Sequence, residues 1–202
     1  MRVLGIDPGS RFTGFGVVDQ IGARLRHVGH GVIRLDGAAP LEQRLDALYR
    51  GLTVAMDTFR PDAVAVEGVF TFKNARSALI LGHARGVALL VAAQRALPVH
   101  EYPPAKVKKA VGANGASDKN AVARMVRTFL TLPELERADA SDALAVAICH
   151  LNHARAAAVP TTKRGAASAA RPFASLADRL RPAYEAPRAA VASKLARTGS
   201  GK

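Results

Sequence analysis

Four carboxylates in the chain have positions and neighbours that suit chemistry on phosphate esters. Asp7 ends the apolar run VLGID, Glu67 ends the apolar run AVAVE, and Asp139 and Asp142 open the segment DASDALAVA. Carboxylate oxygens are the ligands that Mg²⁺ and Mn²⁺ prefer. Two such ions can hold a phosphodiester between them, one activating water and the other binding the leaving oxygen. The four residues therefore predict a metal-dependent enzyme that hydrolyses phosphodiesters.

Each acid also has a simpler interpretation when it is considered alone. Asp7 precedes Pro8-Gly9, and Asp favours turns because it bonds its own backbone. Glu67 could reach solvent beyond the end of its strand, and Asp139 could cap a helix and interact with its dipole. Whether the acids act together depends on whether the fold brings them to one place.

The first third of the chain predicts an antiparallel meander. Three extended runs, 2–7, 13–20 and 24–35, are separated by turn signals at Pro8-Gly9 and Ile21-Gly22. Apolar periodicity and Pro positions then predict four helices, over 41–59, 74–97, 118–130 and 139–155. Two further strands are predicted between them, over 62–69 and 99–102. This order is typical of an α/β fold with a mixed five-stranded sheet, in which helices flank antiparallel and then parallel strands.

The predicted topology places the acids close to one another. A right-handed crossover puts the fourth strand beside the first and parallel to it. Asp7 and Glu67 then end neighbouring strands at the edge of the sheet where ligands bind. Asp139 and Asp142 are three residues apart and share a helix face with Ala143 and Val146, so the acidic end of that helix is expected to point at the sheet.

The overall charge indicates a polyanionic partner. The 202 residues carry 29 Lys and Arg against 16 Asp and Glu, a net charge of +13 with a pI near 10.8. Nucleic acid is the favoured partner, and an anionic membrane surface is the alternative. Cys149 is the only cysteine, which excludes an intramolecular disulfide and thiolate-rich metal sites and suits a reducing cytoplasm. No apolar run is expected to span a bilayer, and the N-terminus is not typical of a signal peptide.

Composition changes near residue 159 and divides the chain into two parts. Residues 1–158 are expected to form the folded domain, with 20 basic and 14 acidic residues. Residues 159–202 contain nine basic residues against Asp178 and Glu185, and few large apolar ones. Such a segment cannot offset the entropy of ordering, so we expect a disordered basic tail, either a nucleic-acid contact or an extension without function.

Four segments make the chain similar to the RuvC family of bacterial Holliday-junction resolvases, members of the ribonuclease H-like superfamily. They are GIDPGSRFTGFGVV, VEGVFTFKNARSALILGHARGVAL, EYPPAKVKKAV and ADASDALAVAICH, in the family's order and spacing between residue 2 and about 155. The resemblance implies a ribonuclease H-like nuclease domain over 1–158 and a homodimer that binds four-way DNA junctions. It further implies two symmetric cuts in strands of like polarity during recombination and DNA repair, and cooperation with a branch-migration motor.

The same resemblance gives the four acids a common role. Asp7 matches the family's first metal-binding acid, Glu67 the second, and Asp139 and Asp142 the pair on the final helix. The resemblance thus implies Mg²⁺ or Mn²⁺ as the cofactor, with two ions in each active site.

Further residues match family positions that contact DNA. Phe70 falls where the family has an aromatic residue that stacks on an unpaired base near the junction. Lys108 and Lys119 match lysines near the scissile phosphate, and Lys119 is expected to stabilise charge in the transition state. Other expected backbone contacts are Arg11, Lys73, Arg76, Lys106 and Lys109.

Three other functions remain possible on the sequence alone. Strand–turn–strand segments with Asp and Gly also hold ATP phosphates in the actin and sugar-kinase group, but those proteins need two such domains. A non-catalytic junction-binding protein would bind DNA without its acids. A transposase-like or RNA-directed nuclease of the same superfamily would differ in its substrate.

Overall fold

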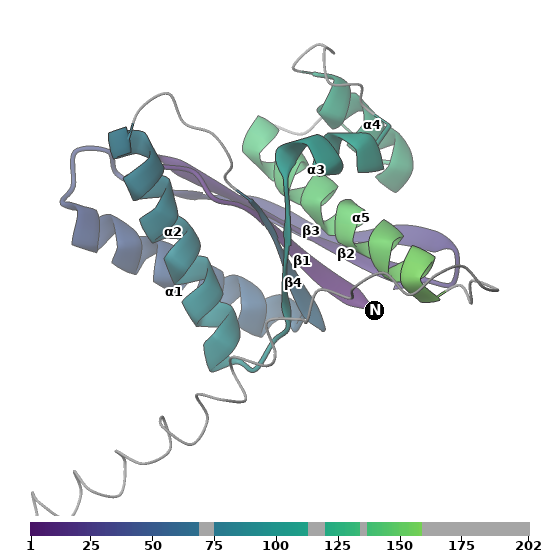
Figure 1. Cartoon of the computed structure of the whole chain (residues 1–202), viewed down its shortest axis with the longest axis horizontal. Coiled ribbons are helices and arrows are strands. Elements are labelled where there is room, and N and C mark those ends of the chain that lie inside the picture. The colour runs from purple at the N-terminus through teal and green to yellow at the C-terminus, as the bar shows by residue number, and fades with distance from the viewer. Residues whose placement is uncertain (69–74, 113–119, 134–136, 159–202) are drawn as a thin grey trace, which may run out of the picture. The chain divides into compact units, whose positions relative to one another are not determined.

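The computed structural model describes residues 1–68, 75–112, 120–133 and 137–158, all of which belong to one compact unit. Its centre is a five-stranded mixed sheet (Figure 1). The strands are β1 (Arg2–Asp7), β2 (Phe12–Ile21), β3 (Arg24–Arg34), β4 (Ala63–Glu67) and β5 (Val99–Tyr102). They lie in the order β3-β2-β1-β4-β5.

The strand pairing confirms the predicted topology. β1, β2 and β3 pair antiparallel, and β4 lies parallel to β1 with Ile6 opposite Val66. β5 continues the sheet parallel to β4. The central strands β1 and β4 are buried on both faces, as their apolar runs predicted. Because they are parallel neighbours, their carboxyl ends meet at one edge of the sheet.

Helices cover both faces of the sheet (Figure 1). One face packs against α1 (Leu41–Phe59) and α2 (Ala75–Gln94), and its buried core includes Leu4, Leu52 and Val91. The other face packs against α3 (Pro104–Ala110), α4 (Ala121–Leu130) and α5 (Ala138–Ala158). Helix α5 is the central element of this second layer because its residues 143–149 are all fully buried.

The predicted helices match the observed ones with three differences, one of which is that α2 ends at Gln94 rather than at the expected 97. Helix α5 runs from Ala138 to Ala158, slightly longer than the 139–155 expected. Helix α3 was not predicted, because it is only seven residues long and too short to show a clear apolar periodicity. Pro104 in fact opens it, at a position where proline loses no hydrogen bond. The predicted starts of the helices at 74 and 118, and the tail over 159–202, fall outside the described residues.

Helix α2 is the most apolar exposed element of the described chain. Its segment Ser77–Gln94 has a mean hydropathy of 1.4 and is long and apolar enough to cross a membrane by length and composition alone. The expectation that no segment reaches that length was therefore wrong. Only 22% of the segment is buried, and Arg85 within it forms an ion pair with Glu101 of β5.

Candidate active site

Two of the predicted acids end neighbouring parallel strands. Asp7 is the last residue of β1 and Glu67 the last of β4, one step beyond the paired residues Ile6 and Val66. Both side chains are partly buried. The two carboxyl groups lie close enough to interact, and this interaction raises the pKa of Asp7 and lowers that of Glu67.

Burial and mutual repulsion keep this pair from ionising fully. Burial, followed by the charge of Glu67, raises the pKa of Asp7 to about 8. Burial also raises the pKa of Glu67, and the nearby charge of Asp142 adds to that effect. Asp7, whose pKa is raised to about 8, needs a nearby cation before it and Glu67 can both be charged at neutral pH.

The other two acids come from the first turns of α5. Burial, followed by the charges of Asp7 and Asp139, raises the pKa of Asp142 to about 6. The charge of Asp139 acts on Asp7 as well. The structure thus brings all four predicted acids into one electrostatically coupled group, called here the acid cluster.

Close packing of α5 on β2 sets the position of Asp139 and Asp142. A Cβ atom on Gly14 would lie 1.9 Å from the backbone oxygen of Asp139. Two residues further along β2, a Cβ on Gly16 would lie 2.6 Å from a side-chain carbon of Leu144. Only glycine at these positions lets the start of α5 come this close to the sheet, and this approach directs the acidic end of the helix toward Asp7.

One cation from α3 acts on the acid cluster. The charge of Lys108 lowers the pKa of both Glu67 and Asp142. Helix α3 is held by the buried side chain of Val107 and by Lys106, whose Nζ lies 5.4 Å from the centre of the Tyr102 ring. The Tyr102 hydroxyl in turn hydrogen-bonds His150 Nδ1 of α5 at 2.8 Å. Lys108 is therefore presented from an element tied to both β5 and α5.

A second cation, not expected from the sequence, contacts the acid cluster directly. Arg137 lies just before α5 and donates from Nε to Asp139 Oδ2 at 3.2 Å. Its Cζ lies 3.7 Å from the centre of the Phe12 ring at the start of β2. No local pattern in the sequence signals this contact, because it depends on how closely α5 approaches β2.

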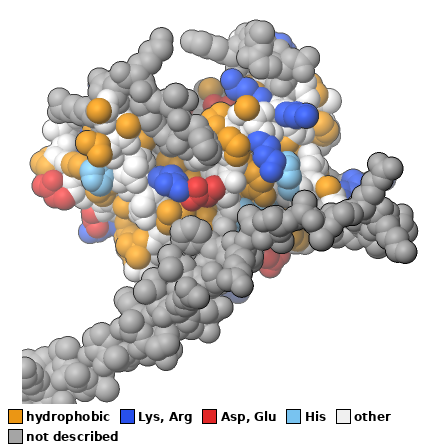
Figure 2. All heavy atoms as spheres, viewed as in Figure 1, with side chains coloured by type: hydrophobic (Ala, Val, Ile, Leu, Met, Phe, Trp, Pro, Cys, Tyr) orange, Lys and Arg blue, Asp and Glu red, His pale blue; other side chains and the backbone are white. Residues whose placement is uncertain are grey.

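The remaining predicted DNA contacts are spread over the surface. Lys106, Lys108 and Lys109 are all exposed on α3, and Arg11 is exposed in the turn after β1. Figure 2 shows Lys and Arg side chains gathered over α3 and α4. The other predicted contacts, Phe70, Lys73, Lys119 and the side chain of Arg76, lie outside the described residues.

The acid cluster suits hard divalent ions whose coordination shell is only partly made of protein ligands and is completed by water and substrate oxygens. Among the described residues, no group of three His, Cys, Asp or Glu side chains is arranged to enclose one ion. Mg²⁺ is usually bound by one or two carboxylates together with water and substrate phosphates. Burial, together with the charges of neighbouring acids, raises the pKa values of Asp7, Glu67 and Asp142, and divalent ions would favour the charged forms of these acids.

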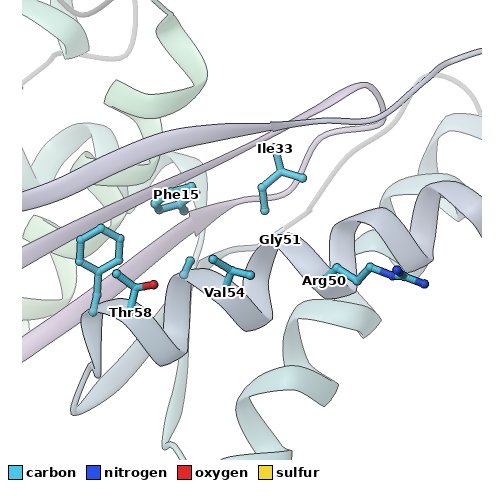
Figure 3. A pocket seen from close by; sticks show the side chains of 8 residues that line it. Phe15, Ile33, Arg50, Gly51, Val54 and Thr58 are labelled. Atoms are coloured by element: carbon cyan, nitrogen blue, oxygen red, sulfur yellow. The ribbon is translucent and has the colours of Figure 1, made fainter.

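A hollow of about 570 Å³ lies on the opposite side of the sheet (Figure 3). It is lined mainly by apolar side chains of α1, β2 and β3, among them Phe15, Ile33, Val54 and Phe59. None of the four acids lines it, so it is separate from the acid cluster.

Comparison with known proteins agrees with this geometry. The family model described as crossover junction endodeoxyribonuclease RuvC matches residues 3–150. A RuvC crossover junction endodeoxyribonuclease of Myxococcus xanthus is 68% identical over 191 residues, which is 94% of this chain and all of that relative. The one from Geobacter sulfurreducens is 52% identical over 154 residues, covering 76% of this chain and 94% of the relative.

Solved structures give the same result. The structure described as T. thermophilus RuvC in complex with Holliday junction substrate is 34% identical, with a TM-score of 0.71, and covers 77% of this chain and 96% of that one. A yeast mitochondrial Holliday junction resolvase, at 13% identity and a TM-score of 0.54, shares the fold. The expected ribonuclease H-like α/β fold is thereby confirmed.

Proposed function

The chain belongs to the RuvC family of crossover junction endodeoxyribonucleases, and from this membership and the acid cluster we propose how it works. It is an endonuclease that resolves four-way DNA junctions in recombination and repair. Cleavage uses Asp7, Glu67, Asp139 and Asp142 at the carboxyl edge of β1 and β4. The observation that carries the proposal is geometric: Asp7 and Glu67 end neighbouring parallel strands, and the start of α5, with Asp139, packs closely on β2 beside them.

In this proposal Asp7, Glu67, Asp139 and Asp142 would together hold two Mg²⁺ or Mn²⁺ ions. When bound, the ions would activate water and hold the leaving oxygen of the phosphodiester. The chain's own contribution is to orient the carboxylates through the packing of α5 on β2 and to release the protons of Asp7 and Asp142. Lys108 favours the charged forms of Glu67 and Asp142, which are the forms that bind metal.

DNA contacts are proposed from the matched family positions. Lys106, Lys108, Lys109 and Arg11 are exposed cations that suit phosphate contacts beside the acid cluster. Additional proposed DNA contacts are Phe70, Lys73, Arg76 and Lys119, with Phe70 stacking on a base and Lys119 stabilising charge during cleavage.

A homodimer, as the resemblance implies, has a suitable surface on α2. Leu79 and Leu90 are 65% and 51% exposed, which is unusual for large apolar side chains on one helix. A Cβ on Gly82 or Gly86 would meet no atom within 4 Å, so a second helix can approach the backbone there. We expect Leu79→Glu to dissociate the dimer in sedimentation experiments. Val54→Glu, at a 64% exposed apolar residue of α1, is the matched control and should not change the oligomeric state.

The rest of the proposal concerns location, partners and the C-terminal segment. A cytoplasmic enzyme working with a branch-migration motor fits the family. Residues 1–158 are proposed as the nuclease domain and 159–202 as a basic tail that contacts DNA. Deleting 159–202 should weaken junction binding and flatten its salt dependence, because fewer phosphates are then neutralised. An unchanged salt slope would contradict this role for the tail.

The central experiment compares cleavage of a labelled four-way junction with that of a linear duplex, with Mg²⁺ or Mn²⁺ supplied in turn. We expect two symmetric cuts in the junction alone. Asp7→Asn should bind the junction and leave it uncut, whereas Asp46→Asn, at an exposed acid paired with Arg50, should cut normally. Binding without scission by the wild type under either ion would favour a non-catalytic junction-binding protein, and ATP hydrolysis without cleavage would favour the ATP-binding group.

A further inference from the structure

Arg137 is held between an aromatic ring and a carboxylate of the acid cluster. Its Cζ lies 3.7 Å from the centre of the Phe12 ring, within the range of a cation–π contact. Its Nε and Nη2 each lie 3.2 Å from Asp139 Oδ2. The side chains of Arg137 and Asp139 are 40% and 29% exposed, so the pair lies at the rim of the acid cluster.

The contact of Arg137 with Asp139 affects the charge of the whole acid cluster. The charge of Asp139 acts on both Asp7 and Asp142, which are already crowded with negative charge. A guanidinium on Asp139 offsets part of that charge while no metal is bound. The same Oδ2 atom faces Arg137 rather than an incoming ion, so metal and guanidinium compete for it.

We propose that Arg137 is a resident counter-cation of the acid cluster, a positioning residue that occupies Asp139 in the metal-free protein and is displaced from Oδ2 when a divalent ion binds. Phe12 keeps the guanidinium at the rim, where it can return. This inference rests on the proposed function, because it assumes that the acid cluster binds metal. Its effect is to weaken metal binding to the free protein and to limit repulsion among the acids.

Arg34 provides a matched control. Its Cζ lies 5.7 Å from the centre of the same Phe12 ring. Arg34→Gln and Arg137→Gln therefore remove the same charge from the same ring, but only Arg137 makes the ion pair with Asp139 described above.

The test is a Mn²⁺ titration of the full chain without DNA. Binding is measured through the rise in melting temperature that Mn²⁺ causes. Partly exposed ion pairs change an equilibrium by up to about fivefold. We therefore expect Arg137→Gln to bind Mn²⁺ about three- to fivefold more tightly than the wild type, and Arg34→Gln to bind like the wild type. A purely structural role would lower the melting temperature equally with and without Mn²⁺ and leave the dissociation constant unchanged.

Three results would overturn the proposal: unchanged Mn²⁺ affinity in Arg137→Gln, weaker affinity in that variant, or equal tightening in both variants. Asp142→Asn separates this inference from the proposed function. If the wild type binds no Mn²⁺, or if binding persists in Asp142→Asn, the proposed metal site itself fails. If binding depends on Asp142 and Arg137→Gln leaves it unchanged, only the role of Arg137 fails.

Discussion

Replacing Asp7 with Asn should stabilise the metal-free protein while it abolishes cleavage. Burial and Glu67 raise the pKa of Asp7 from its usual 3.8 to about 8. The folded protein therefore holds a proton that the unfolded chain has already released, and stability falls as pH rises from about 4 to about 8. Asn carries no such proton, and its amide can still donate a hydrogen bond to Glu67.

The size of this gain follows from the shift in pKa. Each pKa unit corresponds to about 1.4 kcal/mol, so a shift of about four units sets an upper bound on the order of 5 kcal/mol above pH 8. At pH 7 the bound is about 4 kcal/mol, because Asp7 is still mostly protonated in the folded protein. Water entry and side-chain relaxation reduce such values, and we expect a measured gain of about 1–3 kcal/mol at pH 7.

The assay is reversible unfolding in EDTA at pH 5, 6, 7 and 8. For a chain of this size, about 1–3 kcal/mol raises the melting temperature by roughly 3–10 °C. The advantage of Asp7→Asn over the wild type should grow with pH up to about 8 and then level off. Asp46→Asn, at a 55% exposed carboxylate, should show no such trend. An Asp7→Asn advantage that is absent, or that does not change between pH 5 and pH 8, would refute the argument.

The remaining predictions concern cleavage and packing. At a fixed, subsaturating metal concentration, the single-turnover cleavage rate should rise from pH 6 to pH 8, because Asp142 and Asp7 must lose their protons before they bind metal; a flat profile would contradict their role as ligands. Lys108→Gln should slow cleavage by about 10- to 100-fold with a smaller effect on junction binding, measured beside Lys109→Gln, which should have the weaker effect on rate. Gly14→Ala should lower the melting temperature and the cleavage rate together, since its Cβ would clash with the Asp139 backbone; normal values for both would contradict the assigned approach of α5.

Most of the fold was predictable because apolar runs and breaking residues agreed with one another. Val3, Leu4 and Ile6, like Val64 and Val66, read as buried strands and are fully buried. The handedness of crossovers then fixed β4 beside β1, which is confirmed by the parallel pairing of the two strands. The meeting of Asp7 and Glu67 followed from that topology alone.

Other features depended on distances that no local pattern encodes. The contact of Arg137 with Phe12 and Asp139 requires α5 to lie against β2, and that approach depends on the absence of a side chain at Gly14. Similarly, α3 is a short helix whose place is set by Tyr102, His150 and buried Val107 rather than by its own periodicity. The assigned roles of the site residues stay predictions until the variants are measured.

One comparison bears on the tail. The match to the Myxococcus xanthus relative covers 191 residues, more than the 158 assigned to the nuclease domain, whereas the match to the Geobacter sulfurreducens relative covers 154. At least part of 159–202 therefore has a counterpart in one relative. The deletion experiment above tests whether this segment contributes to junction binding.

The acid cluster lowers the stability of the metal-free protein through the same carboxylates that its activity requires. Acids buried beside one another raise the free energy of the metal-free fold, and the same burial beside Glu67 raises the pKa of Asp7 to about 8. The same crowding creates the demand for positive charge that draws divalent ions to this edge of the sheet. Lys108 and Arg137 supply part of that charge from the chain itself, which relieves repulsion and favours the ionised acids, but leaves less negative charge for a divalent ion to offset. A cluster fully neutralised by its own side chains would be stable and unable to bind metal, so an active enzyme of this kind must leave some of its negative charge uncompensated.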